Sequence, residues 1–440
     1  MKPFYLSALF LACLQSSSAT HAINLGPLSG RINDLPIRLD PLTRPITRPL
    51  EDTLGQPLID NLSKVAERLE APLPQLPKLL PILNIEGKTA FVDAEVEQGW
   101  RAVEREWLVM LEDKDLPSLQ ALGVEILEQT HYEQLGMMLL RFKVTPELDS
   151  LAALRERLPT AISARMDRNH IYASQSKRTK ETAAIPPRKA TCNVPVSVGM
   201  IDTAINIKHS VFIADKKTKI TTQTFLADNL AAPDAHGTAV ASVLIGKGDG
   251  MKPLLPKANL FAASVFFERK DYAQGSTLLN LISALNWMAG QKLSVINMSL
   301  AGPDNQILAR AIEKMLTKEF VIVAAAGNEG PAAPPVFPAA YAGVIAVTAV
   351  DNEHNIYRWA NQGSYISFAA LGVGVTAART AGGLGRDSGT SMAAPVVSAF
   401  MACELAQEKT SPAEAFTHLV KEAKDLGEQG RDAVFGYGVL

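Results

Sequence analysis

Long apolar runs recur through the C-terminal part of the chain, at residues 196–201, 260–265, 294–298, 320–326 and 344–350. Between them, apolar residues recur at helical spacing, namely Leu278, Leu281, Ile282, Leu285, Ile307, Leu308, Ala311, Ile312 and Met315. Strands without polar alternation are typical of a parallel sheet that is covered on both faces. The pattern therefore predicts an α/β domain with a doubly wound, mostly parallel sheet over residues 192–440.

A shorter stretch, residues 105–172, follows another order of elements. We expect strands at 106–112, 124–130, 136–144 and 161–167, a helix at 116–122, and a second helix that opens at Thr145-Pro146. The order β-α-β-β-α-β is that of a ferredoxin-like fold. A small ferredoxin-like α+β domain is therefore predicted ahead of the large one.

Two segments are predicted to connect the domains rather than to fold alone. Residues 23–104 hold ten prolines between Pro27 and Pro81, and each proline removes a backbone donor and restricts φ. We interpret them as an extended linker or a partner-docking segment, with one short helix near 58–69. Residues 173–191 are basic and contain Pro186-Pro187, which favours a solvated tether.

The first 22 residues have the pattern of a secretory signal peptide. Lys2 precedes an apolar stretch at 4–14, and Ala19 and Ala22 offer small residues for cleavage. A buried N-terminal helix is the alternative interpretation. No later stretch approaches about 18 uninterrupted apolar residues, so we expect an exported protein, periplasmic or extracellular, with no membrane span in its mature chain.

Charge and cysteine content narrow the function classes. The 43 Lys and Arg against 45 Asp and Glu give a net charge of −2, which argues against a nucleic-acid binder. Removal of the signal peptide takes Cys13 with it and leaves Cys192 and Cys403. An exported protein permits one disulfide between them, and two unpaired buried thiols are the alternative.

Polar residues end three of the apolar strands, at Asp202, Ser299 and Asn328. In doubly wound sheets, sites form at the carboxyl ends of strands, so these side chains are expected in one crevice. His236 and Ser391 are each expected to open a helix beside it. Each residue alone is more often a helix cap or a structural hydrogen bonder. Together, a Ser, a His and an Asp are the minimum set for nucleophilic acyl transfer.

Four segments around these residues resemble the signature segments of the subtilisin-like serine proteases: Val-Gly-Met-Ile-Asp202-Thr, His236-Gly-Thr-Ala-Val-Ala, Ala-Ala-Ala-Gly-Asn328-Glu-Gly and Gly-Thr-Ser391-Met-Ala-Ala-Pro. They occur in that family's order, Asp, His, Ser. The resemblance covers about residues 192–440, and residues 105–172 resemble the family's propeptide. It implies a subtilisin-like fold and a serine endopeptidase that acts on polypeptides without a cofactor.

The resemblance also implies a role for each residue. Ser391 would be the nucleophile, His236 would accept and return its proton, and Asp202 would orient His236 and stabilise its cation. The side-chain amide of Asn328 and the backbone N–H of Ser391 would form the oxyanion hole.

Substrate-binding residues follow from the same resemblance. Ser299-Leu300-Ala301 resembles the extended segment that pairs with substrate backbone. Ala325-Ala326-Gly327 resembles one wall of the pocket for the residue before the scissile bond. Val336 stands where many relatives have Gly at the base of that pocket, so we expect a narrowed pocket for small or medium apolar side chains. Phe337-Pro338 resembles a cis bond of the family.

The chain departs from the family pattern at several positions around the site. The substitutions of usual family residues are Ala204, Ala239, Ala301 and Val396, and none removes a catalytic group. After the His236 helix, the family's usual calcium loop looks absent, since Asp249 has few oxygen donors near it in sequence. We expect no metal there.

Processing is expected as well. Residues 167–172 resemble a propeptide end, so a self-processed zymogen, with the propeptide domain as a partner in cis, is predicted. The cut would fall near Tyr172 or elsewhere in 168–191. We expect the protein to be a monomer.

Two other functions remain open at this point. One is a weakly active or inactive scaffold or binding protein that keeps the subtilisin-like fold. The other is a protease dedicated to one partner that docks through residues 23–104.

Overall fold

The computed structural model of the protein describes residues 76–174, 177–178, 191–213, 219–226, 229–248, 250–269 and 274–440. The predicted signal peptide, the predicted helix near 58–69 and most of the predicted linker at 173–191 lie outside these residues. None of the described helices is long and apolar enough to cross a membrane.

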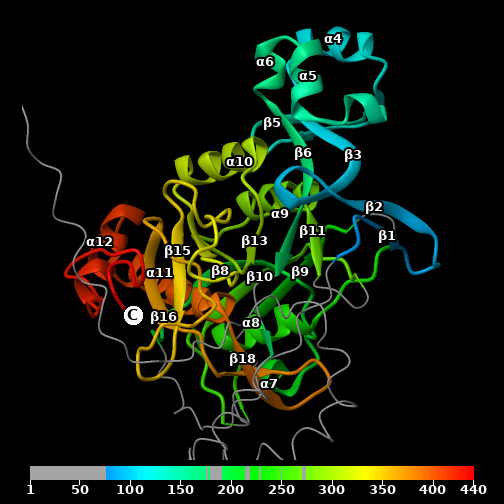
Figure 1. Ribbon diagram of the computed structural model, residues 1–440. Coiled ribbons are helices and arrows are strands. Elements are labelled where there is room, and N and C mark those ends of the chain that lie inside the picture. The colour runs from blue at the N-terminus through cyan, green and yellow to red at the C-terminus, as the bar shows by residue number, and fades with distance from the viewer. Residues whose placement is uncertain are drawn as a thin grey trace, which may run out of the picture. The chain divides into compact units, whose positions relative to one another are not determined.

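Seven parallel strands form the central sheet of the large domain, as predicted (Figure 1). In spatial order they are β16 (Ile366–Leu371), β15 (Ile345–Val350), β14 (Val321–Ala325), β12 (Val295–Met298), β8 (Val196–Asp202), β10 (Ala258–Ser264) and β9 (Lys219–Thr224). Along the chain, β8 is the first strand of this sheet. The next two strands, β9 and β10, lie on one side of β8, and the chain then crosses to β12 on the other side of β8. Such a reversal opens a crevice at the carboxyl end of the strand where it occurs, and here that strand ends at Asp202.

Helices cover both faces of this sheet (Figure 1). Helices α8 (Ala235–Ile245) and α11 (Thr390–Glu408) share one apolar cluster with Val198 and Met200 of β8, and α12 (Pro412–Glu422) packs on the same side. Helices α9 (Leu278–Ala289) and α10 (Gln306–Thr317) share another cluster with Ile201. Neighbouring residues of a strand point to opposite faces, so β8 contributes to both clusters.

A disulfide joins the start of the large domain to α11. Cys192 and Cys403 are bonded, with their Cα atoms 5.8 Å apart. Of the two alternatives that the sequence left open, the structure therefore has the bridge.

The N-terminal domain has the predicted ferredoxin-like strand order, β6-β3-β5-β4. Its elements are β3 (Arg101–Met110), α4 (Leu116–Ala121), β4 (Glu125–Tyr132), β5 (Met137–Lys143), α5 (Leu151–Arg157), α6 (Thr160–Ser163) and β6 (Met166–Ser174). The second helix begins later than expected. Thr145-Pro146 opens only a short 3-10 turn, and α5 begins after Ser150, whose hydroxyl accepts a hydrogen bond from the Ala153 N–H.

A β-hairpin precedes this domain, in the stretch for which we expected an extended segment. Strands β1 (Leu79–Leu83) and β2 (Thr89–Glu95) pair with each other, and β2 also pairs with β3. Pro81 lies in β1, whose described ladder partner is β2 alone, and such an edge strand tolerates the missing donor of proline. The proline content of residues 23–104 therefore led us to expect an extended segment where the structure has a hairpin. The hairpin tolerates Pro81 because β1 is an edge strand.

The last strand was predicted at 161–167, but Thr160–Ser163 form helix α6 and β6 begins only at Met166. Strand β6 then continues beyond its own domain. Its C-terminal residues run antiparallel to β11 (Gly275–Thr277) and β13 (Leu300–Ala301) of the large domain. Further along the chain, β7 (Lys177–Arg178) pairs with β18 (Leu384–Ser388), which also pairs with β17 (Val375–Ala378). The two domains thus share backbone hydrogen bonds on both sides of residues 175–176.

Candidate active site

Asp202 and His236 form a short buried hydrogen bond. Asp202 ends β8, His236 lies in the first turn of α8, and 2.6 Å separates Asp202 Oδ1 from His236 Nδ1. Asp202 Oδ1 also accepts a hydrogen bond from the Thr203 N–H at 2.6 Å. Both side chains are buried, so the carboxylate has a fixed orientation toward one imidazole nitrogen.

A glycine brings these two elements together. A Cβ added at Gly237 would lie 2.5 Å from the carbonyl oxygen of Thr203 and 2.6 Å from that of Ala204. The Gly237 N–H also donates to Thr203 Oγ1 at 2.7 Å. Because backbone atoms occupy the space, only glycine lets α8 start this close to the end of β8.

The charge of Asp202 sets the protonation of His236. Burial of the ring favours its neutral form. The Asp202 carboxylate and its hydrogen bond oppose burial and raise the pKa of His236 above its ordinary value. Such a histidine stabilises a proton that it takes up from a neighbouring group.

Ser391 lies in the first turn of α11, the helix that packs beside α8. The preceding Gly389 has a φ of +151°, a conformation that glycine adopts readily. Ser391 Oγ and His236 Nε2 are both buried, and neither has a hydrogen-bond partner among the described residues. Buried polar atoms without partners are uncommon, and a role in catalysis is one explanation for them.

Asn328 is held next to Ser391 by the intervening Thr390. The Asn328 side-chain oxygen accepts hydrogen bonds from Thr390 N at 3.0 Å and from Thr390 Oγ1 at 3.1 Å. Its amide NH₂ is therefore on the side away from Thr390. Ser299 reaches the same turn, because its hydroxyl donates to the backbone oxygen of Ser391 at 3.1 Å.

The remaining predicted residues surround this set. Leu300 and Ala301 form β13 and pair with Ser174 and Ala173 of β6. Ala325 ends β14, and Ala326 and Gly327 lead from it to Asn328. Val336 is buried beside Phe337, whose backbone forms two hydrogen bonds with Gly302 immediately after β13. The Phe337-Pro338 bond is cis, as the family resemblance implied.

One feature of the site was not apparent from the sequence, namely the space that holds the Tyr172 side chain. The Tyr172 side chain is fully buried, and its hydroxyl donates to the backbone oxygen of Pro303 at 3.1 Å. A Cβ added at Gly302 would lie 2.3 Å from the ring. A glycine beside the predicted extended segment was the available signal, since it leaves room for a neighbouring side chain.

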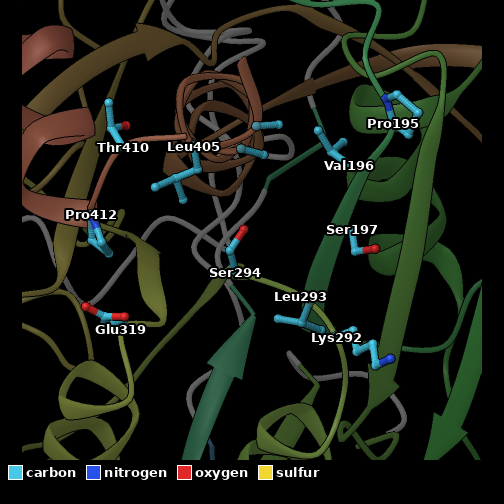
Figure 2. Close-up of a pocket in the computed structure, with 12 residues that line it drawn as sticks. Pro195, Val196, Ser197, Lys292, Leu293, Ser294, Glu319, Leu405, Thr410 and Pro412 are labelled. Carbon is cyan, nitrogen blue, oxygen red and sulfur yellow. The ribbon is translucent and has the colours of Figure 1, made fainter. Parts of the chain in front are cut away.

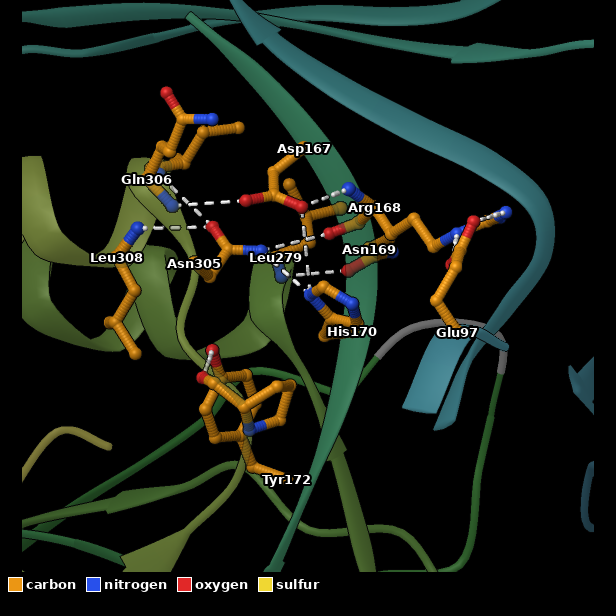
Figure 3. A network of polar contacts seen from close by, with 12 residues as sticks. Glu97, Asp167, Arg168, Asn169, His170, Tyr172, Leu279, Asn305, Gln306 and Leu308 are labelled. Atoms are coloured by element: carbon orange, nitrogen blue, oxygen red, sulfur yellow. Dashed lines mark hydrogen bonds and ion pairs between the residues drawn. The ribbon is translucent and has the colours of Figure 1, made fainter. Parts of the chain in front are cut away.

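Strand β6 also binds the large domain through polar side chains (Figure 3). Asp167 Oδ2 accepts a hydrogen bond from Gln306 N at 3.0 Å, at the start of α10, and Asn169 Oδ1 accepts one from Leu279 N at 3.1 Å, at the start of α9. Asn305 Nδ2 donates to His170 Nδ1 at 2.9 Å. The contacts of Asp167 and Asn169 satisfy backbone N–H donors that a helix N-terminus leaves open.

Burial shifts two pKa values in this network in opposite directions. Burial raises the pKa of Asp167 to about 6, although two backbone N–H groups oppose the rise. Burial, with the positive charge of Arg168, lowers the pKa of His170 to about 4. The interface therefore favours a neutral imidazole.

An open pocket lies at the amino ends of the strands of the parallel sheet, opposite the candidate active site (Figure 2). Its volume is about 490 Å³, and its lining includes Val196 at the amino end of β8 and Ser294 just before β12. The catalytic candidates lie at the carboxyl ends of the same strands. This pocket is therefore separate from the candidate active site.

Among the described residues, no cluster of three or more His, Cys, Asp or Glu side chains is arranged to hold a metal ion. Asp249, the acidic residue considered for a calcium loop, lies outside the described residues.

Comparison with known proteins gives consistent matches. The sequence profile of the subtilase family matches residues 195–438. Minor extracellular protease Epr of Bacillus subtilis (strain 168) is 30% identical over 253 residues, which cover 56% of this chain and 37% of Epr. Subtilisin DY of Bacillus licheniformis is 30% identical over 241 residues, 53% of this chain and 85% of subtilisin DY. The chain thus spans little more than a third of one relative and most of the other.

One solved structure resembles most of the chain. Fervidolysin from Fervidobacterium pennivorans, a keratinolytic enzyme related to subtilisin, gives a TM-score of 0.63 over 84% of this chain and 63% of that chain. The two sequences are 17% identical, so this likeness concerns the fold.

Proposed function

Because the chain belongs to the subtilase family, we propose that it is a serine endopeptidase that cleaves polypeptides through Ser391, His236 and Asp202. The 2.6 Å hydrogen bond between Asp202 and His236 carries this proposal. It orients the ring, while His236 Nε2 and Ser391 Oγ are both buried and have no hydrogen-bond partner among the described atoms.

The reaction proceeds in two halves. Ser391 Oγ attacks the carbonyl carbon of the scissile bond, and its proton passes to His236 Nε2. Asp202 stays ionised and stabilises the imidazolium. The C–N bond then breaks, the leaving amine takes the proton from His236, and the acyl group stays on Ser391. In the second half, water attacks the carbonyl carbon of this ester and gives a proton to His236 Nε2. His236 then returns that proton to Ser391 Oγ as the ester C–O bond breaks, which releases the carboxyl product.

The oxyanion hole is formed by the Asn328 side-chain amide and the backbone N–H of Ser391. The hydrogen bonds from Thr390 to the Asn328 oxygen support this role, because they fix the amide before substrate arrives. Donors that are already oriented stabilise the developing charge without reorganisation.

Substrates bind as an added strand between β11 and β13. The pairing of β6 with both strands supports this mode, because an extended segment of this chain already makes those backbone contacts. Buried Val336 supports a narrowed pocket that prefers small or medium apolar side chains before the scissile bond.

The protein is made as a zymogen that cuts itself between Ser174 and Lys177. The described chain pairs with β13 up to Ser174 and with β18 from Lys177, and β18 leads directly to Ser391. A cut just after Tyr172 is disfavoured, since Ala173 and Ser174 continue the same strand pairing. We expect the middle bond, Gln175–Ser176, to be cut. Gln175 is neither small nor apolar, so we infer that the strand pairing on both sides of this bond positions it, rather than the pocket for the residue before the scissile bond. The N-terminal sequence pattern and the extracellular relative support export to the periplasm or medium.

Intact mass of the exported wild type, measured beside that of Ser391→Ala, tests both the peptidase activity and the self-processing. A wild type that starts at Ser176, with a variant that lacks only its signal peptide, is the expected result. Shortening of both proteins would assign the cut to another protease.

The second candidate is an inactive scaffold. The pairing of β6 with β11 and β13, which fills the cleft between these two strands, is also compatible with that function. Labelling by a fluorophosphonate separates the two, because it needs an activated serine. The expected result is labelling of the wild type and none of Ser391→Ala. Unlabelled wild-type protein freed of residues up to 175 would favour the scaffold.

A further inference from the structure

The hairpin β1–β2 packs against the large domain through an apolar cluster. Phe91 of β2 meets Phe267 edge-to-face, with ring centroids 5.1 Å apart. Ile82 of β1 belongs to the same cluster, and Leu226 and Leu230 of the large domain pack against it. At the hairpin turn, the Ile85 N–H donates to the backbone oxygen of Asn229 at 3.0 Å.

A buried charge cluster lies next to these rings. Asp93 of β2 is completely buried and forms an ion pair of 2.8 Å with Arg269 of the large domain, which is 4% exposed. Arg101 Nε donates to the other Asp93 oxygen at 2.8 Å, and Arg101 Nη1 donates to Pro77 O, just before the hairpin. Burial raises the pKa of Asp93, and both guanidinium groups oppose that rise.

The cluster lies behind the strand that holds β6. A Cβ added at Gly275 of β11 would come within 2.7 Å of Arg269 Nε and of the Phe267 ring. Gly275 itself is opposite Ala173 of β6 in the antiparallel register. The hairpin and the tail of β6 therefore bind neighbouring parts of one surface beside the cleft.

The ferredoxin-like fold is complete without this hairpin, since β3 to β6 and their helices supply all its elements. We propose that the hairpin acts as a clasp, meaning that it keeps the N-terminal domain bound over the cleft after the connecting chain has been cut. The Asp93–Arg269 ion pair is the polar contact that stabilises this binding. The inference rests on the proposed function in one respect, namely that the cleft it blocks is that of a peptidase.

Loss of either charge of the Asp93–Arg269 pair should weaken binding of the N-terminal domain. Asp93 forms a buried ion pair with Arg269 across the domains and a hydrogen bond with Arg101 within its own domain. Replacing Asp93 or Arg269 removes the ion pair that crosses the interface while the remaining charge stays buried in the bound state. Breaking a buried pair in this way corresponds to roughly 100-fold in an equilibrium constant. The clasp therefore predicts a large effect of Asp93 or Arg269 on retention of the N-terminal domain.

The experiment uses the full chain in a Ser391→Ala background. A recognition sequence for a site-specific protease is inserted between Thr182 and Ala183, and complete cutting is verified by mass. Retention of the N-terminal fragment is then measured by gel filtration over a dilution series. The variants are Asp93→Asn, Arg269→Gln and their double, and the matched control is Glu86→Gln, an exposed hairpin residue paired with Lys88.

We expect the parent fragments to co-elute, and each single variant to raise the dissociation constant about 100-fold. The double variant should be no worse than either single one, because the two residues act as a pair. The control should stay within about twofold of the parent. Variants within threefold of the parent, additive effects, or parent fragments that separate at micromolar concentration would overturn the clasp.

Two features protect this test. Arg269→Gln lies outside the N-terminal domain, so it remains informative if Asp93→Asn disturbs that domain. Hydrogen exchange of residues 79–95 in the uncut chain gives a second readout, and faster exchange is expected in both variants. Because Ser391 is absent throughout, an inactive wild type would end the proposed function and leave this result unaffected.

Discussion

The ring of Tyr172 lies so close to Gly302 that a Cβ at position 302 would come within 2.3 Å of it. Tyr172 belongs to β6 of the N-terminal domain, and Gly302 follows β13 of the large domain. The tyrosine hydroxyl donates to Pro303 O, so both the ring and its polar end are accommodated. The absence of a side chain at one position therefore makes the pocket for the other.

Gly302→Ala should slow self-processing about tenfold or more. Its backbone lies outside the left-handed region, so the effect is steric, and the tail of β6 can no longer seat its tyrosine. A time course of intact mass after export measures the rate. The double variant Gly302→Ala/Tyr172→Ala should recover part of the loss because the space is restored. A Gly302→Ala enzyme that matures at the wild-type rate would contradict the pocket.

Gly237→Ala should lower kcat at least about tenfold, with less effect on KM. The new Cβ would meet two backbone carbonyl oxygens, so α8 must shift and His236 moves away from Asp202. Steady-state kinetics with active-site titration tests this. Unchanged kcat would show that the close approach of α8 to β8 has no bearing on the reaction.

The acidic limb of kcat/KM should lie above the ordinary histidine pKa. Only neutral His236 can accept the Ser391 proton, and Asp202 raises its pKa, so activity falls as pH drops through that raised value. Asp202→Asn removes the charge, so its weak residual activity should persist to lower pH. A limb that stays in place in Asp202→Asn would assign the titration to another group.

His170 should make the seating of β6 sensitive to acid. Its pKa is about 4 in the folded chain and near 6.5 when unfolded, so the unfolded chain binds a proton first and stability falls as pH drops from about 6.5 to about 4. The full effect is about 3 kcal/mol. Asp167 titrates in the same pH range. Burial raises its pKa, so its contribution to stability increases as pH drops, the reverse of that of His170. A comparison of Ser391→Ala with Ser391→Ala/His170→Gln cancels this contribution, because Asp167 is present in both proteins.

Urea unfolding at several pH values measures that difference. The free energy of unfolding of Ser391→Ala should fall relative to that of the double variant as the buffer becomes more acidic. Parallel pH profiles would show that His170 does not titrate between the two states.

Replacing Cys192 and Cys403 together by Ser should lower the free energy of unfolding by about 2–4 kcal/mol. The bridge closes a separation of 211 residues, so its loss frees a long segment of the unfolded chain. Urea unfolding in the Ser391→Ala background avoids self-digestion. An unchanged midpoint would mean that packing of α11 alone holds the start of the domain.

The candidate catalytic set was predictable from the sequence because its positions follow from local patterns. Asp202, Ser299 and Asn328 follow apolar runs, and the carboxyl ends of parallel strands meet at one edge. His236 precedes Gly237 and Ser391 comes two residues after Gly389, and both lie in the first turn of a helix. The fold class was predictable for the same reason, since strand and helix periods are read over short windows.

Other features depend on partners that are distant in sequence. The tail of β6 is ordered by pairing with β11 and β13, which lie more than 100 residues further along the chain. The hairpin at 79–95 and its Asp93–Arg269 pair were hidden because prolines suggested an extended segment, whereas an edge strand tolerates one. Local patterns along the chain therefore predict the fold class and the candidate catalytic residues. Which segment lies in the cleft, and which contacts hold it there, depends on tertiary contacts between surfaces that no local pattern describes.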